Sequence, residues 1–224
     1  MISFKQIFIT IISVLFSLFV LFISNITYDI PLEELKKEFK NKNSKFIEID
    51  GVLVHYVDEG EGIPVVLLHG TGASLHTWDL WAERLKDKYR VIRITLPGFG
   101  LSGPRSDKKY KIKDYVNLLE SFVSQIGIEK FHLAGNSLGG SVAWLYTSFY
   151  EKRVIKLVLI NSSGFKSEDI PFVIRIAKNK YLNFLIKKTS PQFLIKKSLK
   201  EVFYDDNLIS NSIIERYYKL NLRE

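Results

Sequence analysis

The sequence predicts an α/β fold, in which a mostly parallel sheet carries helices on both faces. Between residues 45 and 164, short apolar runs with the length of buried strands alternate with amphipathic helical patterns. This alternation is typical of parallel sheets, because a helix is the usual connection that returns the chain to the starting edge. The second observation is a Gly-x-Ser-x-Gly motif at residues 135–139, where one such strand is followed by a helix.

The N-terminal segment is a separate element. Residues 6–28 carry no charge and consist mostly of Ile, Phe, Leu and Val, which is enough helix to cross a hydrocarbon core of roughly 30 Å. A cleaved signal peptide is the alternative, but it needs small residues at the end of the apolar run, and the first 50 residues contain no Ala or Gly. We therefore expect a membrane anchor at residues 1–28, with secretion after cleavage as the alternative.

The charges that flank the anchor give conflicting signals about its orientation. Lys5 and the amino terminus favour a cytoplasmic N-terminus, whereas the five lysines between residues 36 and 45 favour the opposite by the positive-inside rule. A large following domain can be exported despite such charges. We expect a single-pass protein whose domain lies outside the cytoplasm.

The first half of the domain follows a linker at residues 29–44, which includes a short helical pattern at 32–39. Asp50-Gly51 favours a two-residue hairpin turn between two strands. The uninterrupted apolar run at 64–68 is typical of a strand buried on both faces. The predicted elements are strands at 45–49, 52–58, 64–68 and 90–96 and a helix at 77–86.

The second half contains an amphipathic helix at 112–126, a strand from residue 131, a helix that ends near residue 150, and a strand at 155–160. After this sixth strand the pattern changes. Residues 170–222 show only helical patterns, with breaks at Ser190-Pro191 and near Asp205-Asp206. We therefore assign residues 45–164 to the sheet-containing core and residues 165–224 to a helical, cap-like region.

The motif at 135–139 predicts a nucleophile elbow, a tight turn that presents a serine from a strained backbone conformation. Gly135 and Gly139 are required because the residues that flank Ser137 must be nearly bare. Such a serine needs a histidine to accept its proton and an acid to orient that histidine.

The chain has four histidines, and all of them precede the serine of the elbow: His55, His69, His76 and His132. In folds that use this elbow, the chain order is serine, acid, histidine. We therefore find no triad histidine in the chain, and the triad acid is unassigned.

Four segments, in order, resemble the α/β-hydrolase family, in its branch of serine-nucleophile esterases and carbon–carbon bond hydrolases. They are Leu-Leu-His-Gly at 67–70, Leu-Pro-Gly-Phe-Gly-Leu-Ser at 96–102, Gly-Asn-Ser-Leu-Gly-Gly at 135–140 and Leu-Val-Leu-Ile-Asn at 157–161. The resemblance implies eight strands, a helical cap after the sixth, the acid after the seventh and the histidine after the eighth. The last two strands are not found in these residues, so we expect the chain to be incomplete.

The candidate site centres on Ser137 as the nucleophile. The backbone N–H of Leu138, at a helix N-terminus, is expected to stabilise the oxyanion. The resemblance implies that the N–H of Thr71 is the second donor and that His69 and Gly70 support this oxyanion loop; direct proton transfer by His69 is the alternative. The resemblance also places an aspartate at the nucleophile position of dehalogenases and epoxide hydrolases, so a serine argues against those activities.

Composition excludes several classes of function. The net charge is +8, but the lysines are dispersed and no nucleic-acid-binding signature accompanies them. Residues 165–224 contain twelve basic and seven acidic residues, which fits either a solvated surface or contact with anionic lipid. The chain has no cysteine, metal-ligand cluster or phosphate-binding loop. We expect a cofactor-free, membrane-anchored serine hydrolase that cleaves an ester or a related small carbonyl substrate. The alternative is a catalytically inactive, membrane-bound binding or scaffold protein.

Overall fold

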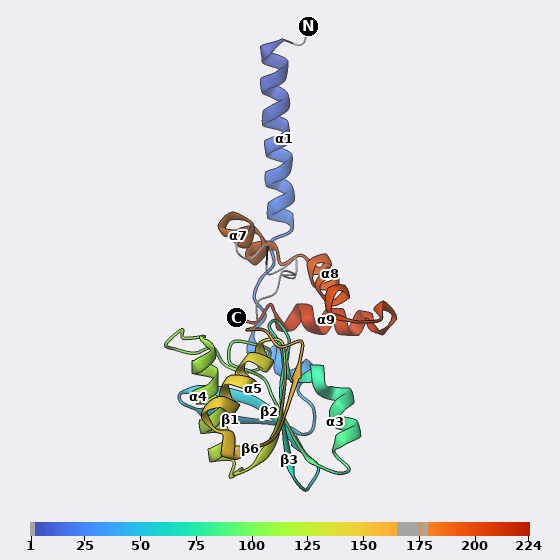
Figure 1. Cartoon of the computed structure of the whole chain (residues 1–224). Coiled ribbons are helices and arrows are strands. Elements are labelled where there is room, and N and C mark those ends of the chain that lie inside the picture. The colour runs from blue at the N-terminus through green and yellow to red at the C-terminus, as the bar shows by residue number, and fades with distance from the viewer. Residues whose placement is uncertain (1–2, 165–174, 176–178) are drawn as a thin grey trace. The chain divides into compact units, whose positions relative to one another are not determined.

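The structure is a computed structural model that describes residues 3–164, 175 and 179–224 (Figure 1). It forms two compact units. One contains Pro31–Ser167 with Lys219–Arg223, and the other contains Met1–Ile30 with Glu168–Tyr218 and Glu224. The first unit holds the sheet and the candidate site, and the second holds the long N-terminal helix.

The described residues form one sheet of six strands in the order β1-β2-β4-β3-β5-β6. The first two pairings, β1 with β2 and β2 with β4, are antiparallel, and the other three are parallel. This arrangement confirms the predicted mostly parallel sheet. The strands are β1 (Ser44–Ile49), β2 (Val52–Glu59), β3 (Pro64–Leu68), β4 (Arg90–Ile94), β5 (Phe131–Asn136) and β6 (Val154–Ile160).

Local sequence explains the start of the sheet. Asp50 and Gly51 both have positive φ, +50° and +75°, as a two-residue hairpin turn between β1 and β2 requires. Alternate residues of β3 enter opposite cores: Val66 and Leu68 join one apolar cluster, whereas Val65 and Leu67 join the other. The continuous apolar run therefore reflects burial on both faces, as predicted.

Helices cover both faces of the sheet (Figure 1). The larger core lies under α4 (Ile112–Gln125) and α5 (Leu138–Phe149), with Phe122 and Tyr146 fully buried. The smaller core lies under α3 (Asp79–Leu85), where Trp78 and Ala82 are buried. The remaining short elements of this unit are α2 (Leu32–Phe39) and the 3₁₀ turn η2 (Glu151–Arg153).

Two elements of this unit differ from the predicted ones by more than one residue at a boundary. The helix expected at 77–86 is a 3₁₀ turn, η1 (Leu75–Trp78), followed by α3; its three-residue period points Leu75 and Trp78 into the core together. The strand expected at 90–96 ends at Ile94. The reason is that the N–H of Leu96 donates to the His69 ring instead of to a strand.

The described part of the cap-like region is helical, as predicted. It contains α7 (Lys180–Thr189), α8 (Gln192–Val202), the 3₁₀ turn η3 (Asp206–Leu208) and α9 (Asn211–Leu220), so both expected breaks are present. The parts of the expected helical pattern at 170–174 and 176–178 lie outside the described residues.

Helix α1 (Phe4–Ser24) contains 21 residues, and none of its side chains is buried. It is long and apolar enough to cross a membrane, but a signal sequence meets the same criterion. The helix ends four residues before Tyr28, the expected end of the apolar segment. The structure thus contains the expected helix and leaves anchor and signal peptide as alternatives.

Candidate active site

Ser137 lies at the turn between β5 and α5 in a strained backbone conformation. Its φ is +50° and its ψ is −114°, a region that non-glycine residues rarely occupy and that costs of order 1–3 kcal/mol. The surrounding structure must hold such a residue in place. This geometry is that of a nucleophile elbow.

Sterics explain the two glycines of the motif. A Cβ on Gly135 would overlap the carbonyl of Gly139, and a Cβ on Gly139 would overlap the carbonyl oxygen of Leu68. Both clashes are with backbone, which cannot rotate away. The elbow is therefore closed tightly against the end of β3, and any side chain at either glycine would open it.

Backbone hydrogen bonds fix the elbow on both sides. Ser137 N–H donates to the carbonyl of Ile160 over 3.1 Å, and the Ser163 N–H donates to the Ser137 carbonyl over 3.1 Å. Gly139 N–H donates to the His69 carbonyl over 3.1 Å. The end of β6 and the loop after β3 thus hold the strained residue.

The loop after β3 lies directly against the nucleophile. A Cβ on Gly70 would come within 2.9 Å of the Asn136 side-chain oxygen and within 3.1 Å of the Ser137 Cβ. Only a residue without a side chain lets this backbone approach so closely. The structure therefore brings together Gly70 and Ser137, which the sequence placed in one site, and Thr71 is the next residue of the same loop.

His69 orients this loop through both ring nitrogens. The side chain is fully buried, and its Nε2 accepts a hydrogen bond of 2.9 Å from the Leu96 N–H. The ring proton is therefore on Nδ1, which donates to the Gly70 carbonyl over 2.7 Å. Burial lowers the pKa of His69 to about 4, so the ring is neutral at pH 7. With both nitrogens engaged, the geometry favours a supporting role over proton transfer from Ser137.

The bond to Gly70 sets the direction of the Thr71 N–H. The two groups belong to one peptide unit, and the described chain contains no cis peptide bond, so the N–H points opposite to the carbonyl. By holding the carbonyl, His69 directs the Thr71 N–H away from itself. Within the described residues, no hydrogen bond is found from the N–H of Thr71 or from that of Leu138. Leu138 directly follows the nucleophile, and Thr71 follows Gly70, whose backbone lies against Ser137.

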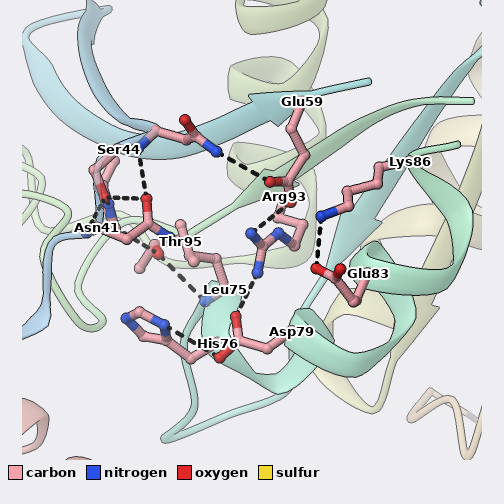
Figure 2. A network of polar contacts seen from close by, with 12 residues as sticks. Asn41, Ser44, Glu59, Leu75, His76, Asp79, Glu83, Lys86, Arg93 and Thr95 are labelled. Carbon is pink, nitrogen blue, oxygen red and sulfur yellow. Dashed lines mark hydrogen bonds and ion pairs between the residues drawn. The ribbon is translucent and has the colours of Figure 1, made fainter. Parts of the chain in front are cut away.

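A polar network ties the segment after the oxyanion loop to the sheet (Figure 2). The Arg93 side chain is 4% exposed and bonds to Glu59 over 2.7 Å and to the carboxylate of Asp79 on α3. The Leu75 N–H donates to the Thr95 hydroxyl over 3.3 Å. Because η1 and α3 continue directly from the loop, these contacts limit its movement.

The other three histidines are engaged away from the nucleophile. His55 contacts the Ser44 hydroxyl at 2.9 Å and the Thr95 hydroxyl at 3.3 Å, and burial lowers its pKa to about 3. His76 lies 3.6 Å from Asp79, and His132 packs against the Tyr89 ring. None of the four histidines, all of which the structure describes, is hydrogen-bonded to Ser137.

Asp205 and Asp206, in the described part of the cap-like region, have local partners. Asp205 accepts a hydrogen bond from the Asn207 N–H over 2.9 Å, and Asp206 pairs with Lys200. Among residues 3–164, 175 and 179–224, no group of three or more metal-ligating side chains is arranged to hold an ion. The expectation of cofactor-free chemistry stays a prediction.

Sequence reasoning missed two supporting residues. Arg93 had a signal, since an arginine inside an apolar strand needs nearby carboxylates. Asn221 had none: its side-chain amide donates to the Gly72 carbonyl over 2.8 Å, although 149 positions separate the two residues. Both residues act on the oxyanion loop or its continuation.

Comparison with known proteins identifies the family. The family model for the alpha/beta hydrolase fold matches residues 63–189, a range that includes the oxyanion loop, the elbow and the sixth strand. The chain belongs to the α/β-hydrolase fold family. The resemblance noted from the four sequence motifs is thereby confirmed.

The relatives include several hydrolases. The chain is 28% identical over 177 residues to 2-hydroxymuconate semialdehyde hydrolase of Pseudomonas sp. (strain CF600), covering 77% of this chain and 59% of the relative. It is 29% identical over 167 residues to human Epoxide hydrolase 4, covering 70% and 46%. A meta-cleavage product hydrolase from Pseudomonas fluorescens IP01 superposes with a TM-score of 0.68 and 28% identity, covering 80% of this chain and 64% of that one. The chain thus spans about half the length of these curated relatives.

Proposed function

We propose that this protein is a membrane-anchored serine hydrolase that cleaves an ester or a related small carbonyl substrate. The observation that carries the proposal is the strained Ser137, with φ of +50°, which lies against Gly70 of the oxyanion loop, while the N–H groups of Leu138 and Thr71 have no partner in the described chain. Strain at a nucleophilic side chain is a feature of active sites because it costs stability without improving packing. The helix α1 supports the anchor by its length and apolar composition.

The reaction would begin with attack of the Ser137 hydroxyl oxygen on the substrate carbonyl carbon. The hydroxyl proton passes to a base, and the carbonyl electron pair moves onto oxygen to form an oxyanion. The N–H groups of Leu138 and Thr71 would receive that oxyanion, and the N-terminus of α5 would favour its charge. Each donor contributes roughly 3 kcal/mol of transition-state stabilisation, about a hundredfold in rate.

Collapse of this intermediate expels the leaving group, which takes the proton from the base and leaves an acyl-serine. Water, deprotonated by the same base, then attacks the acyl carbon and releases the acid and the free serine. Both halves use the same oxyanion donors. The substrate is therefore defined by a carbonyl carbon that carries an alkoxide or a stabilised carbanion as leaving group.

We further propose that the base and the acid come from outside residues 1–224. The support is that none of the four histidines is hydrogen-bonded to Ser137 and that the chain covers 59% of a hydrolase relative. The reading frame downstream of Glu224 tests this directly. We expect it to encode an acid and then a histidine after further strands. A stop codon at that point, with no companion gene nearby, would count against the proposal.

The second candidate is a catalytically inactive binding or scaffold protein on the membrane. The observation that favours it is the absence of any histidine bonded to Ser137 among these residues. Removal of a triad member leaves a small fraction of the catalytic rate. The two candidates therefore differ in whether Ser137 can be acylated at all.

A p-nitrophenyl ester, with and without added imidazole, separates the candidates. Imidazole supplies the base in solution, so a hydrolase predicts a burst of one equivalent of p-nitrophenolate that imidazole accelerates. Ser137→Ala is the control, and its rate corrects for direct hydrolysis by imidazole. Equal traces for the two proteins at every imidazole concentration would favour the scaffold.

A further inference from the structure

The unit that contains α1 also has, apart from that helix, a surface with the composition of a lipid-binding face. Residues 179–204, which span α7 and α8, contain six lysines and one glutamate. Three aromatic side chains in the same stretch are solvent-exposed: Phe184 is 58% exposed, Phe193 is 67% exposed and Tyr204 is fully exposed. Exposed aromatic rings among lysines are characteristic of helices that lie in a membrane interface.

A direct contact places this stretch at the end of the apolar helix. The Thr27 N–H donates to the Lys188 carbonyl over 2.9 Å, and both residues belong to the same compact unit. Thr27 follows the last residue of α1 by three positions. A helix of 21 residues spans about 31 Å at 1.5 Å per residue, which is the thickness of the hydrocarbon core. The end of α7 therefore lies at the headgroup level of any bilayer that α1 crosses.

Helix α8 begins three residues after α7 ends, so it starts at the same level. One face of α8 packs against the rest of the protein, because Leu194 and Leu199 are buried. Its outer face carries Phe193, Lys196 and Lys197, which the helical period brings to one side. The lysine stems can lie along the acyl boundary while their ammonium groups reach the phosphates.

We propose that α7 and α8 dock on the surface of the bilayer that α1 crosses, with a preference for anionic lipids. The proposal rests on the membrane anchor of the proposed function and adds the partner of this unit, an anionic headgroup layer. Charge decides between lipid and a protein partner. Six lysines against one glutamate over 26 residues, together with three exposed aromatic rings, match an anionic headgroup layer. Docking would keep α7 and α8 at the bilayer, where any ester substrate that is a lipid would be found.

The absence of cysteine in the chain makes the test specific. We would label Phe193→Cys in the full chain with an environment-sensitive fluorophore and reconstitute it into neutral phosphatidylcholine vesicles or into vesicles with added phosphatidylglycerol. Lipids with a nitroxide near the headgroup act as quenchers. We expect blue-shifted, quenched emission in anionic vesicles, and recovery of emission at 1 M salt, where the Debye length falls to about 3 Å. Tyr204→Cys is the second labelling site if the first variant does not fold.

Charge reversal assigns the effect to α8. Lys196→Glu with Lys197→Glu should abolish the quenching, whereas Lys40→Glu with Lys42→Glu changes the net charge equally and should leave it intact. An equal loss in both variants would overturn the assignment. Flotation of the vesicles separates the two proposals: a chain that floats but shows no quenching refutes the docking and leaves the anchor standing, and a chain that does not float refutes both.

Discussion

The two buried histidines predict a loss of stability at mildly acidic pH. Burial lowers the pKa of His69 to about 4 and that of His55 to about 3, from 6.5 in the unfolded chain. Below pH 6.5 the unfolded chain therefore binds protons that the folded chain does not, so the free energy of unfolding falls as the pH falls. Above pH 6.5 both states are neutral and the effect vanishes.

The size of the effect follows from the shifts. Between pH 7.5 and pH 5, each histidine removes about 2 kcal/mol of stability, because each pH unit between the two pKa values is worth about 1.4 kcal/mol. Carboxylates contribute little in this range, since their unfolded pKa values lie near 4. A total loss of about 4 kcal/mol is a large part of the stability of an ordinary domain.

The variant that isolates one group is His69→Gln, because glutamine is neutral at all pH values and can still donate to Gly70 and accept from Leu96. We would measure urea unfolding of the full chain in non-ionic detergent by tryptophan fluorescence at pH 7.5 and pH 5. The variant should lose about 2 kcal/mol less than the wild type across this range. An equal loss in the two proteins would refute the assignment of a depressed pKa to the buried ring.

Three further outcomes are expected. Gly139→Ala should destabilise the fold by at least about 3 kcal/mol, since the new Cβ meets the Leu68 carbonyl. The control Gly103→Ala, whose Cβ has its nearest neighbour at 3.4 Å, should cost under about 1 kcal/mol, and equal melting temperatures for the two variants would contradict the prediction. Arg93→Met should cost roughly 3 kcal/mol and speed amide exchange in residues 71–75, because two carboxylates lose their ion pair with the buried guanidinium. Unchanged exchange would show that the network does not hold the loop. The chain should stay in the membrane pellet after a carbonate wash and keep Met1 or Ile2 at its terminus, whereas a mature terminus near Asn25 by mass spectrometry would indicate a cleaved signal peptide.

Local signals in the sequence were enough to predict the frame of the site. The hairpin at Asp50-Gly51, the doubly buried strand at 64–68 and the elbow around Ser137 each depend on residues close together in sequence, whose steric demands are fixed by residue type. The order of strands and helices then restricted the topology to a mostly parallel sheet, because connections of this type have one preferred hand.

Interactions between distant residues account for what was missed. Strand β4 stops at Ile94 because the Leu96 N–H donates to the ring of His69, 27 positions earlier, instead of to a strand. The 3₁₀ turn before α3 depends on Thr95, which binds the Leu75 N–H across 20 positions. No periodicity in the sequence reports such bonds, so the boundaries nearest the site were the least predictable.

The most direct test of the central claim is the site of attachment of a fluorophosphonate probe. The probe phosphonylates a serine only where the hydroxyl is activated and the phosphoryl oxygen is stabilised by oxyanion donors. We would react the full chain with the probe in the presence of imidazole, which supplies the base in solution, digest it and map the adduct by mass spectrometry, with Ser163→Ala as the matched control. Modification of the peptide that contains Ser137, lost in Ser137→Ala and retained in Ser163→Ala, is the predicted result. Modification spread over several serines, or unchanged in Ser137→Ala, would contradict the assignment of Ser137 as the nucleophile.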